Sequence, residues 1–524
     1  MFLTWLSSLP QRLSGWPLRG RALFAFALGA LSVLAMPPYC WWLILGLTVP
    51  LFYALLSTTH SAKTAFLEGW LFAFGYFGLG LMWIGNALLV EGNPFSWVWP
   101  LAIAGLPALL GFFYAIPAAL LHRYTKIASL SGWAAMIGTF ALSEWLRGHM
   151  FTGFPWNLFG YTWNSSLPLA QSVSLVGSYG LTLLTLFWAM LPALLWIKAA
   201  KQQVLRISLI GGISFAGLLF WGYARLANHP VDLRSDMVVR LVQPNIPQED
   251  KWDSRKANDN ARKLLDLTVP DEGNAGATTL VIWPETAISE TFLMHEHVQP
   301  AIREVLGDYK RPVYLMTGLL RREISQNGDA DRYYNSLATY DAQLNQITLY
   351  DKSHLVPFGE YIPYQNLIPL NPFVNFGGFE KGAGPQTQTV EQGLHISPLI
   401  CYEIIFPHAT TDNQSLRPDL IVNVTNDAWY GDSAGPRQHL AMTRFRAIEE
   451  GVAVARAANT GISGLFDPYG RLLAHIDLDH DGAKNIALPR SIERVTYSRM
   501  GDLLFFLLLA PLLVLIFLKD NQGQ

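Results

Sequence analysis

Long uninterrupted apolar segments constrain the fold of this chain more than any other feature of its sequence. They fill residues 22–226 and return at 503–518, whereas most of the charged side chains lie between these two regions. A helix needs about 20 apolar residues to cross the bilayer core. Only 15% of the residues are charged, well below the roughly 25% of soluble domains. The pattern therefore predicts an α-helical membrane bundle with an inserted soluble domain.

Eight of these segments are long enough to be predicted as transmembrane helices. Prolines inside several of them are compatible with this prediction, because membrane helices tolerate proline better than soluble helices do. We expect a domain of seven helices at 1–226, a soluble domain at 227–501, and an eighth helix with a short tail at 502–524. The predicted spans are 22–37, 39–57, 66–90, 95–121, 127–147, 168–197, 207–226 and 503–518.

Basic residues mark one side of the predicted bundle. The connections on the other side, at residue 38, 91–94 and 148–167, contain no Lys or Arg. Because Lys and Arg collect in cytoplasmic loops, both termini are predicted to be cytoplasmic. Residues 227–501 would then face the periplasm from a bacterial inner membrane. The basic connections hold Arg12, Arg19, Arg21, Lys63, Arg123, Lys126, Lys198, Lys201, Arg206 and Lys519.

Few charged residues interrupt the spans, namely Glu68, Glu144, Arg147 and Arg225. In a transporter, such residues would line an ion path. We favour positions near helix ends or facing the bundle interior. The net charge of −2 gives no reason to expect nucleic acid as a partner.

Residues 227–501 alternate short β-rich runs with helical stretches. Some runs, such as 279–287, are almost continuously apolar, which is typical of strands buried on both faces. Helices are predicted at 254–269, 297–308 and 437–450, and this alternation predicts a layered α/β fold. The predicted strands are 237–246, 279–287, 313–320, 335–341, 347–355, 395–403, 420–427 and 452–468.

A long irregular segment at 356–384 is rich in proline, glycine and aromatic residues. A loop of this length inside a compact domain is commonly a lid or a binding loop. We expect its aromatic side chains to cover a substrate and to exclude water.

Three predicted strands each end in a group capable of catalysis, namely Glu285, Lys352 and Cys401. Sites in α/β sheets form at the carboxyl ends of strands, so these groups could converge. A thiol nucleophile needs a base, and a carboxylate in a dry pocket can be that base. A lysine nearby would stabilise an oxyanion, helped by the backbone N–H of Tyr402. Each residue alone has a structural alternative, since a single buried Cys is usually part of a core.

The motifs that hold these residues, WPET, DKSHLVPFGEYIP and ICYE, resemble the three catalytic motifs of the nitrilase, or carbon–nitrogen hydrolase, superfamily. The resemblance implies an α-β-β-α sandwich and a Glu–Lys–Cys triad. It implies Glu285 as general base, Lys352 as transition-state stabiliser and Cys401 as nucleophile. A second glutamate eight residues after the lysine, Glu360, would orient the lysine and the nucleophile.

Over essentially all 524 residues, the chain resembles the apolipoprotein N-acyltransferase family of Gram-negative bacteria. Segments 151–161, 242–253, 423–431 and 457–470 are similar to segments of that family. The resemblance implies transfer of an acyl chain from a phospholipid, phosphatidylethanolamine by resemblance, through a thioester on Cys401. The acceptor would be the α-amino group of the S-diacylglyceryl N-terminal cysteine of an apolipoprotein, the final step of lipoprotein maturation. No cofactor is expected.

Residues around the predicted triad are given smaller roles. Tyr402 and Glu403 flank the nucleophile, and we expect Glu403 to support the site rather than to titrate in it. Trp252 resembles a family tryptophan near the substrate entrance, although a packed aromatic side chain is an equal alternative. Asn426 and Trp429 could line the pocket or only shape a turn.

Other candidate groups fit less well. His295 and His297 form an HxH pair without a third ligand nearby, so no metal site is expected. His354 and His439 allow a Cys–His pair, but the Glu and Lys motifs make such a pair redundant. Ser463 lies in GISG, which lacks the G-x-S-x-G spacing of a nucleophile elbow.

Two alternative functions stay open. A membrane-anchored amidase or nitrilase would share the triad and release a free acid, but it would not explain eight spans or the apolar loop at 148–167. A transporter or channel with a non-catalytic outer domain predicts polar residues along the spans and unchanged function after Cys401→Ala. We expect the lipid bilayer and two lipid-bearing substrates as partners, and nothing in the sequence argues against a monomer.

Overall fold

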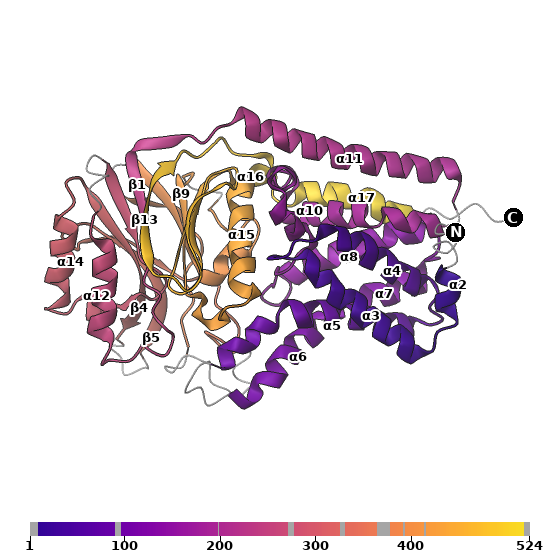
Figure 1. The fold of residues 1–524 in the computed structure, drawn as a ribbon, viewed down its shortest axis with the longest axis horizontal. Coiled ribbons are helices and arrows are strands. Elements are labelled where there is room, and N and C mark those ends of the chain that lie inside the picture. The colour runs from indigo at the N-terminus through magenta and orange to yellow at the C-terminus, as the bar shows by residue number, and fades with distance from the viewer. Residues whose placement is uncertain are drawn as a thin grey trace. The chain divides into compact units, whose positions relative to one another are not determined.

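The chain divides into two compact units (Figure 1). The first unit holds the described residues up to His229 and from Thr496 onwards, and the second spans Pro230–Val495. The computed structural model describes residues 9–89, 96–197, 199–270, 277–324, 331–363, 378–390, 393–412 and 416–517.

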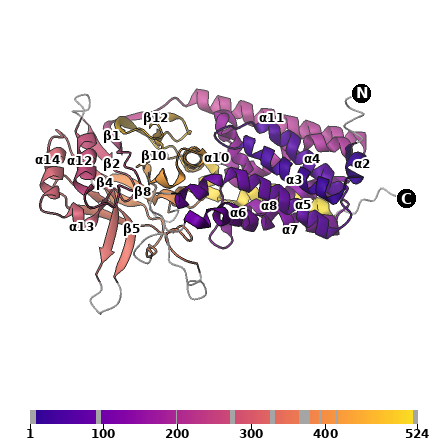
Figure 2. The same ribbon diagram turned by 60° about the horizontal axis from the view of Figure 1, so that its bottom comes forward.

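The first unit is built from helices, and helices occupy all eight segments predicted to span the membrane (Figures 1 and 2). The α-helices are α2 (Leu9–Ser14), α3 (Leu18–Ser32), α4 (Leu45–Ser57), α5 (Ala62–Gly80), α6 (Trp99–Leu110), α7 (Phe112–Tyr124), α8 (Leu130–His149), α9 (Leu167–Ala170), α10 (Val173–Ala189), α11 (Lys201–Asn228), α16 (Thr496–Met500) and α17 (Leu503–Phe517). The 3₁₀ helices are η1 (Val33–Ala35), η2 (Trp42–Ile44), η3 (Met82–Leu88), η4 (Ser96–Val98), η5 (Phe159–Ser165) and η6 (Leu191–Trp196).

The helices of this unit differ in how well they meet the requirements for crossing a bilayer. The bent pair Ala62–Gly80 and Met82–Leu88, with 53° between its halves, is apolar enough to form one broken span. Trp42–Ser57 and Leu503–Leu515 are apolar but shorter. These helices are those of a membrane protein, and the count of eight spans stays a prediction. Among the described residues, four helices are long and apolar enough by themselves: Leu18–Ala35, Ser96–Tyr124, Val173–Trp196 and Lys201–Asn228.

Helices α3 and α5 approach each other closely through glycines. A Cβ placed on Gly29 would lie 1.8 Å from the carbonyl oxygen of Phe72, and one placed on Gly75 would lie 2.3 Å from that of Phe26. Membrane helices associate through such contacts, because lipid supplies no hydrophobic driving force between them. Small residues at these positions therefore determine how α3 and α5 cross.

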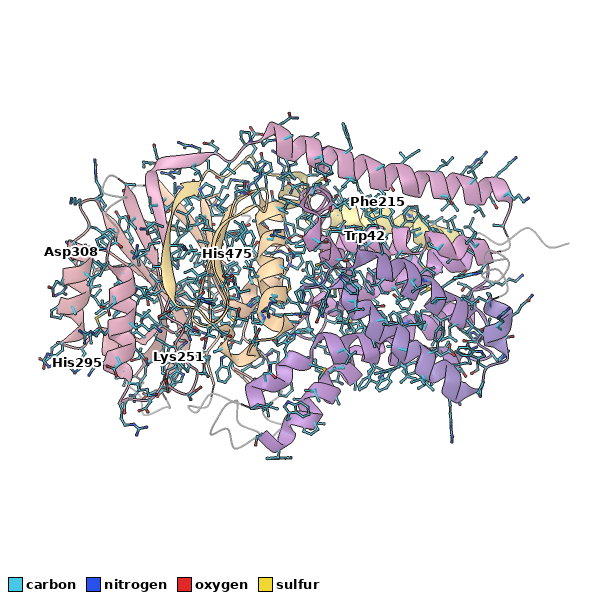
Figure 3. All side chains as sticks on the ribbon, in the orientation of Figure 1. Trp42, Phe215, Lys251, His295, Asp308 and His475 are labelled. Carbon is cyan, nitrogen blue, oxygen red and sulfur yellow. The ribbon has the colours of Figure 1, made fainter. Side chains whose placement is uncertain are left out.

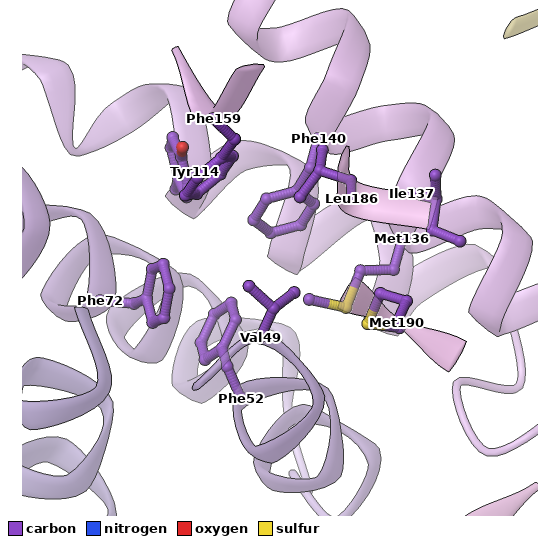
Figure 4. A pocket seen from close by; sticks show the side chains of 10 residues that line it. All are labelled: Val49, Phe52, Phe72, Tyr114, Met136, Ile137, Phe140, Phe159, Leu186 and Met190. Atoms are coloured by element: carbon purple, nitrogen blue, oxygen red, sulfur yellow. The ribbon is translucent and has the colours of Figure 1, made fainter. Parts of the chain in front are cut away.

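Aromatic side chains fill the core of the helical unit (Figure 4). Phe52 stacks on Phe72 with ring centroids 4.3 Å apart, and Tyr114 meets Phe140 edge to face at 5.2 Å. The cavity that they leave measures about 10 Å³, roughly the space of one water molecule. No acyl chain fits there. The cavity is lined by Val49, Phe52, Phe72, Tyr114, Met136, Ile137, Phe140, Phe159, Leu186 and Met190.

Three of the four charged residues noted within the spans, Glu68, Glu144 and Arg147, are buried and paired. Glu68 accepts a hydrogen bond from Nε of Arg21 at 2.7 Å. Glu144 forms an ion pair of 2.5 Å with Arg147 and accepts a hydrogen bond of 2.8 Å from Tyr114. A charge buried without a partner would be strongly destabilising. The carboxylates and Arg147 therefore face the interior of the unit, which is the placement favoured from the sequence.

The second unit contains two β-sheets whose central strands are parallel. The first sheet has the order β13-β1-β2-β4-β5-β6, with β3 paired to β4, and the second has the order β12-β11-β10-β9-β8-β7. Figure 2 shows the antiparallel strands β4 and β5 extending together. The strands are β1 (Leu233–Gln243), β2 (Thr278–Ile282), β3 (Ile288–Ser289), β4 (Val313–Glu323), β5 (Arg332–Tyr340), β6 (Gln346–Asp351), β7 (Gln388–Val390), β8 (Leu394–Ile400), β9 (Leu420–Thr425), β10 (Ala453–Ala458), β11 (Ser463–Phe466), β12 (Leu472–Ile476) and β13 (Gly482–Pro489).

Alternating side chains of the first sheet enter two different cores, because successive residues of a strand point to opposite faces. Val239 and Leu241 belong to the core between the sheets, whereas Val242 packs in the core under the helices on the outer face. Those helices lie beyond the first sheet, and α15 lies beyond the second (Figure 1). The predicted α-β-β-α sandwich is thus confirmed. The helices of this unit are α12 (Ala257–Thr268), α13 (Glu290–Leu293), α14 (Val298–Gly307) and α15 (Ala434–Glu450).

The strand prediction was wrong in two respects. The single strand predicted at 452–468 is two strands, β10 and β11, which are separated by a turn containing Gly461 with φ of +147°. Strands β7, β12 and β13 were missed. All three lie at sheet edges and contain partly exposed residues, so a continuous apolar run is not required. The two-residue strand β3, which pairs with β4, was also missed.

Gly75→Ala should destabilise the helical unit, because the new Cβ would meet the carbonyl oxygen of Phe26 at 2.3 Å. We expect the free energy of unfolding to fall by about 1–3 kcal/mol, the usual effect of overpacking. Gly78→Ala on the same helix is the matched control, since nothing lies within 4 Å of its new Cβ. The midpoint of thermal unfolding in detergent is measured for both variants. Equal midpoints would contradict the close contact between Gly75 and Phe26.

Candidate active site

Cys401 lies at the carboxyl end of β8 and begins the short 3₁₀ helix η9 (Cys401–Ile405). Its φ is +51°, in the left-handed region that non-glycine residues rarely adopt. The carbonyl oxygen of Cys401 accepts a hydrogen bond from Nδ2 of Asn423 at 3.4 Å and lies 3.2 Å from Nε2 of His439. Strained backbone of this kind persists where the surroundings hold it, and it is typical of functional sites.

A buried ammonium group lies between two carboxylates. Nζ of Lys352, which directly follows β6, is 2.8 Å from Oε1 of Glu360 and 3.5 Å from Oε1 of Glu285. Glu285 follows the end of β2 by three residues. All three side chains are buried. The structure thus brings together the three charged residues predicted from the strand ends and motifs.

Two amide groups orient the carboxylate of Glu285. Nδ2 of Asn335 donates to Oε1 of Glu285 at 2.8 Å and to Oε1 of Glu360 at 3.1 Å. The backbone N–H of Asn426 donates to Oε2 of Glu285 at 2.8 Å. Asn335 was missed from the sequence, and no spacing in the sequence singles it out. Asn426 contacts the site through its backbone, whereas its Nδ2 donates to Gln248 at 2.7 Å.

The thiol and the ammonium group influence each other's ionisation. Burial, and next the charge of Glu285, raise the pKa of Cys401 to about 12, and the charge of Lys352 offsets part of this rise. Burial opposes the charge of Lys352, but the carboxylates of Glu360 and Glu285 raise its pKa above the usual value. At neutral pH the site therefore holds a neutral thiol beside a lysine that stays charged. Such a thiol needs a base to become a nucleophile.

Glu403 connects the nucleophile's turn to the lysine's strand. Its Oε1 accepts hydrogen bonds from the hydroxyl of Tyr350 at 2.8 Å and from the backbone N–H of Ser353 at 2.7 Å. Its Oε2 accepts from the backbone N–H of Ile400 at 2.8 Å. These contacts hold the residues next to Cys401, so the structural role expected for Glu403 agrees with its geometry.

A second buried network lies behind the nucleophile. Asp427 is 3.0 Å from Nδ1 of His439 and 2.6 Å from Nη2 of Arg456. Burial opposes the charge of Asp427, but Arg456 and His439 lower its pKa to about 2. Burial and Arg456 lower the pKa of His439. Since His439 faces the carbonyl oxygen of Cys401, it is placed to support the turn and not to act as a base.

The aromatic candidates occupy different environments. Tyr402 is buried and packs edge to face on Phe406 with ring centroids 5.2 Å apart. Trp252 is 50% exposed. Trp429 is partly buried on η10 (Asp427–Tyr430). Of the predicted lid at 356–384, residues 364–377 lie outside the described residues.

Lys251 is a further charged group that the sequence analysis missed, although it lies in the segment 242–253. Its Nζ donates to the backbone carbonyl oxygen of Glu285 at 2.9 Å. Its proximity to Trp252 in the sequence was the available signal. Within the described ranges, no group of three or more His, Cys, Asp and Glu residues is arranged to hold a metal ion.

Comparisons with known proteins agree over most of the chain. The family model described as "Apolipoprotein N-acyltransferase N-terminal domain" matches residues 28–191, and the one described as "Carbon-nitrogen hydrolase" matches 238–491. The apolipoprotein N-acyltransferase of Rhodopseudomonas palustris is 37% identical, over 97% of this chain and 96% of its own. That of Allorhizobium ampelinum is 40% identical, over 91% of each chain. An amidase structure from Nesterenkonia sp. is 16% identical, over 53% of this chain and 99% of its own, with a TM-score of 0.35.

Alkylation by iodoacetamide tests the ionisation of Cys401. Because burial raises its pKa to about 12, the rate should still be rising at pH 10, whereas a free thiol with a pKa of about 8.5 is then fully ionised. Glu285→Gln removes a negative charge beside the thiol, so its profile should shift to lower pH. Glu296→Gln, on an exposed side chain, should leave the profile unchanged. A wild-type plateau near pH 8, or identical profiles for all three proteins, would contradict this electrostatic description.

Proposed function

The chain belongs to the apolipoprotein N-acyltransferase family, and from this premise we propose how its residues perform the acyl transfer. The donor is a phospholipid, phosphatidylethanolamine by resemblance. The acceptor is the α-amino group of the S-diacylglyceryl N-terminal cysteine of an apolipoprotein. The observation that carries the proposal is the buried Lys352 ammonium group, which lies 2.8 Å and 3.5 Å from two carboxylates beside the Cys401 thiol.

The first half-reaction forms a thioester. Glu285 takes the proton of the Cys401 thiol as the sulfur attacks the ester carbonyl carbon. The ammonium group of Lys352 and the backbone N–H of Tyr402 stabilise the resulting oxyanion. When the tetrahedral intermediate collapses, the bond to the lipid oxygen breaks, and Glu285 returns the proton to that oxygen. A lysophospholipid leaves, and the acyl chain stays on Cys401.

The second half-reaction uses the same groups in reverse. The amine of the acceptor attacks the thioester carbonyl, and Glu285 accepts a proton from the amine. Collapse of the intermediate forms the amide, breaks the carbon–sulfur bond and returns the proton to Cys401. The thioester divides one difficult exchange of ester for amide into two easier steps. Water must be excluded while the thioester exists, which is the function proposed for the 356–384 loop.

Glu360 has a positioning role in this proposal. Its Oε1 accepts hydrogen bonds from Lys352 and Asn335, and its Oε2 accepts one from the backbone N–H of Val356. It therefore connects the lysine to the first residue of the predicted lid. Trp252, Asn426 and Trp429 are proposed to contact substrate, with Trp252 at the entrance because its side chain is half exposed.

The proposed setting is a bacterial inner membrane, crossed by eight helices. The transmembrane domain comprises residues 1–226, and the catalytic domain comprises residues 227–501 and faces the periplasm. Residues 502–524 form the eighth helix and a cytoplasmic tail. The distribution of Lys and Arg supports this orientation, with both termini in the cytoplasm. The protein is proposed to act as a monomer.

Product analysis distinguishes the acyltransferase from a hydrolase that uses the same triad. Incubation with phospholipid and an S-diacylglyceryl peptide should give an N-acylated peptide and lysophospholipid, detected by mass spectrometry. Cys401→Ala should abolish both products. Cys40→Ala, at the other free cysteine, should retain activity. Release of free fatty acid with no acylated peptide would favour the amidase alternative and contradict the proposal.

Glu360→Gln should lower the rate of thioester formation by about 10- to 100-fold, because the charge-assisted contact with Lys352 is lost. The contact orients the lysine and does not bind the donor, so the effect is expected in kcat and not in KM. Glu380→Gln, at an exposed position of the same segment, is the control. Equal rates for the two variants would show that Glu360 has no positioning role.

A further inference from the structure

Lys251 has a hydrogen-bonding capacity that the proposed chemistry does not use. It lies in the turn between β1 and α12 (Figure 3), and its Nζ donates to the backbone carbonyl oxygen of Glu285 at 2.9 Å. A lysine ammonium group has three donors. In the part of the chain that the structure describes, the other two donors have no hydrogen-bond partner.

The charge of Lys251 also lacks a carboxylate partner among the described residues. Of the three acidic residues of the same turn, Asp250 is paired with Lys256 at 2.5 Å and Asp253 with Arg255 at 2.6 Å. The third, Glu249, is exposed and forms no ion pair with Lys251 in the described part of the chain. Burial lowers the pKa of Lys251 to about 8, and the charge of Glu285 only partly offsets this effect. Lys251 is partly buried, and removing part of an ammonium group from water without pairing it with an anion is unfavourable. Groups whose pKa is perturbed in this way cluster at functional sites.

The turn is open to a ligand. Trp252, the next residue, is 50% exposed, and Nζ of Lys251 lies 5.9 Å from the centre of its indole ring. The ammonium group therefore lies between an exposed aromatic side chain and the backbone of the catalytic residue Glu285. A molecule whose reacting carbonyl group is at Cys401 can place a second group against this turn.

We infer that Lys251 binds the phosphate group of the phospholipid donor and so selects a phosphate-bearing ester for the first half-reaction. This inference rests on the proposed function. In a glycerophospholipid, the phosphate is attached to the same three-carbon glycerol unit as the acyl esters. An ester carbonyl at Cys401 therefore brings the phosphate within a few bonds of the nucleophile. Lysine is a common ligand of phosphate groups in proteins.

The two substrates differ in the chemistry that this site would recognise. The S-diacylglyceryl group of the acceptor is joined to cysteine through a thioether and carries no phosphate. Lys251 is therefore expected to act in the formation of the thioester and not in its transfer to the amine. This separation distinguishes donor recognition from a general effect on Glu285, which both half-reactions require.

The test uses the full-length enzyme in detergent micelles and two acyl donors. Phosphatidylethanolamine carries the phosphate, and p-nitrophenyl palmitate lacks it, while both give an acyl adduct on Cys401 that mass spectrometry quantifies. Lys251→Met should slow adduct formation from the phospholipid by about tenfold or more, and from the neutral ester by less than about twofold. Lys251→Arg should recover most of the phospholipid rate. Lys263→Met, whose charge is paired with Asp481, is the control and should leave both rates unchanged.

Each other outcome overturns the inference. Equal losses with both donors would mean that Lys251 acts through Glu285, and unchanged rates would mean that it has no role. A loss confined to transfer from the preformed thioester would assign Lys251 to the acceptor peptide. Equal inhibition of both donors by inorganic phosphate, absent in Lys251→Met, would identify free phosphate as the ligand. A wild-type enzyme that reacts with the neutral ester but with no phospholipid would contradict the proposed function itself.

Discussion

A buried ammonium group is the interaction on which the catalytic unit depends. Lys352 is almost fully removed from water, and a charge in that position is stable only beside opposite charge. Glu360 and Glu285 supply it, and Asn335 bridges the two carboxylates. These residues come from different strands and loops of one sheet, so the charge cluster exists only when the sandwich is folded. The same cluster places a permanent positive charge beside a neutral thiol.

The charged residues buried in the helical unit are also stabilised by opposite charges, in a part of the protein predicted to be surrounded by lipid. Arg21 with Glu68 and Arg147 with Glu144 are buried as pairs, so that none of these four charged groups is exposed to lipid. Because these pairs are internally satisfied, they give no support to an ion path, and a transporter function loses its main structural argument. An enzyme whose donor and acceptor both carry acyl chains has a physical reason to be held in a bilayer.

The sequence predicted the catalytic charges better than the groups that orient them. Glu285 and Lys352 follow strand ends, Glu360 lies in the same motif as the lysine, and the structure places both carboxylates within ion-pair distance of Lys352. Asn335 and Lys251 could not be predicted in the same way, because their contacts depend on how β5 and the turn after β1 meet other strands. Apolar runs located the helices but not their breaks, such as the 53° bend between α5 and η3. Strands β7, β12 and β13 were missed because their partly exposed side chains interrupt the apolar pattern.

Covalent catalysis by Cys401 is the central claim, and one measurement tests it most directly. Purified enzyme is incubated with phospholipid alone, and the intact protein is weighed by mass spectrometry. The account predicts one added acyl mass that hydroxylamine removes and that Cys401→Ala does not acquire. If protein that is active in detergent acquired no adduct from any phospholipid, the thioester mechanism would be wrong, and hydrolysis of an amide would become the better explanation of the triad.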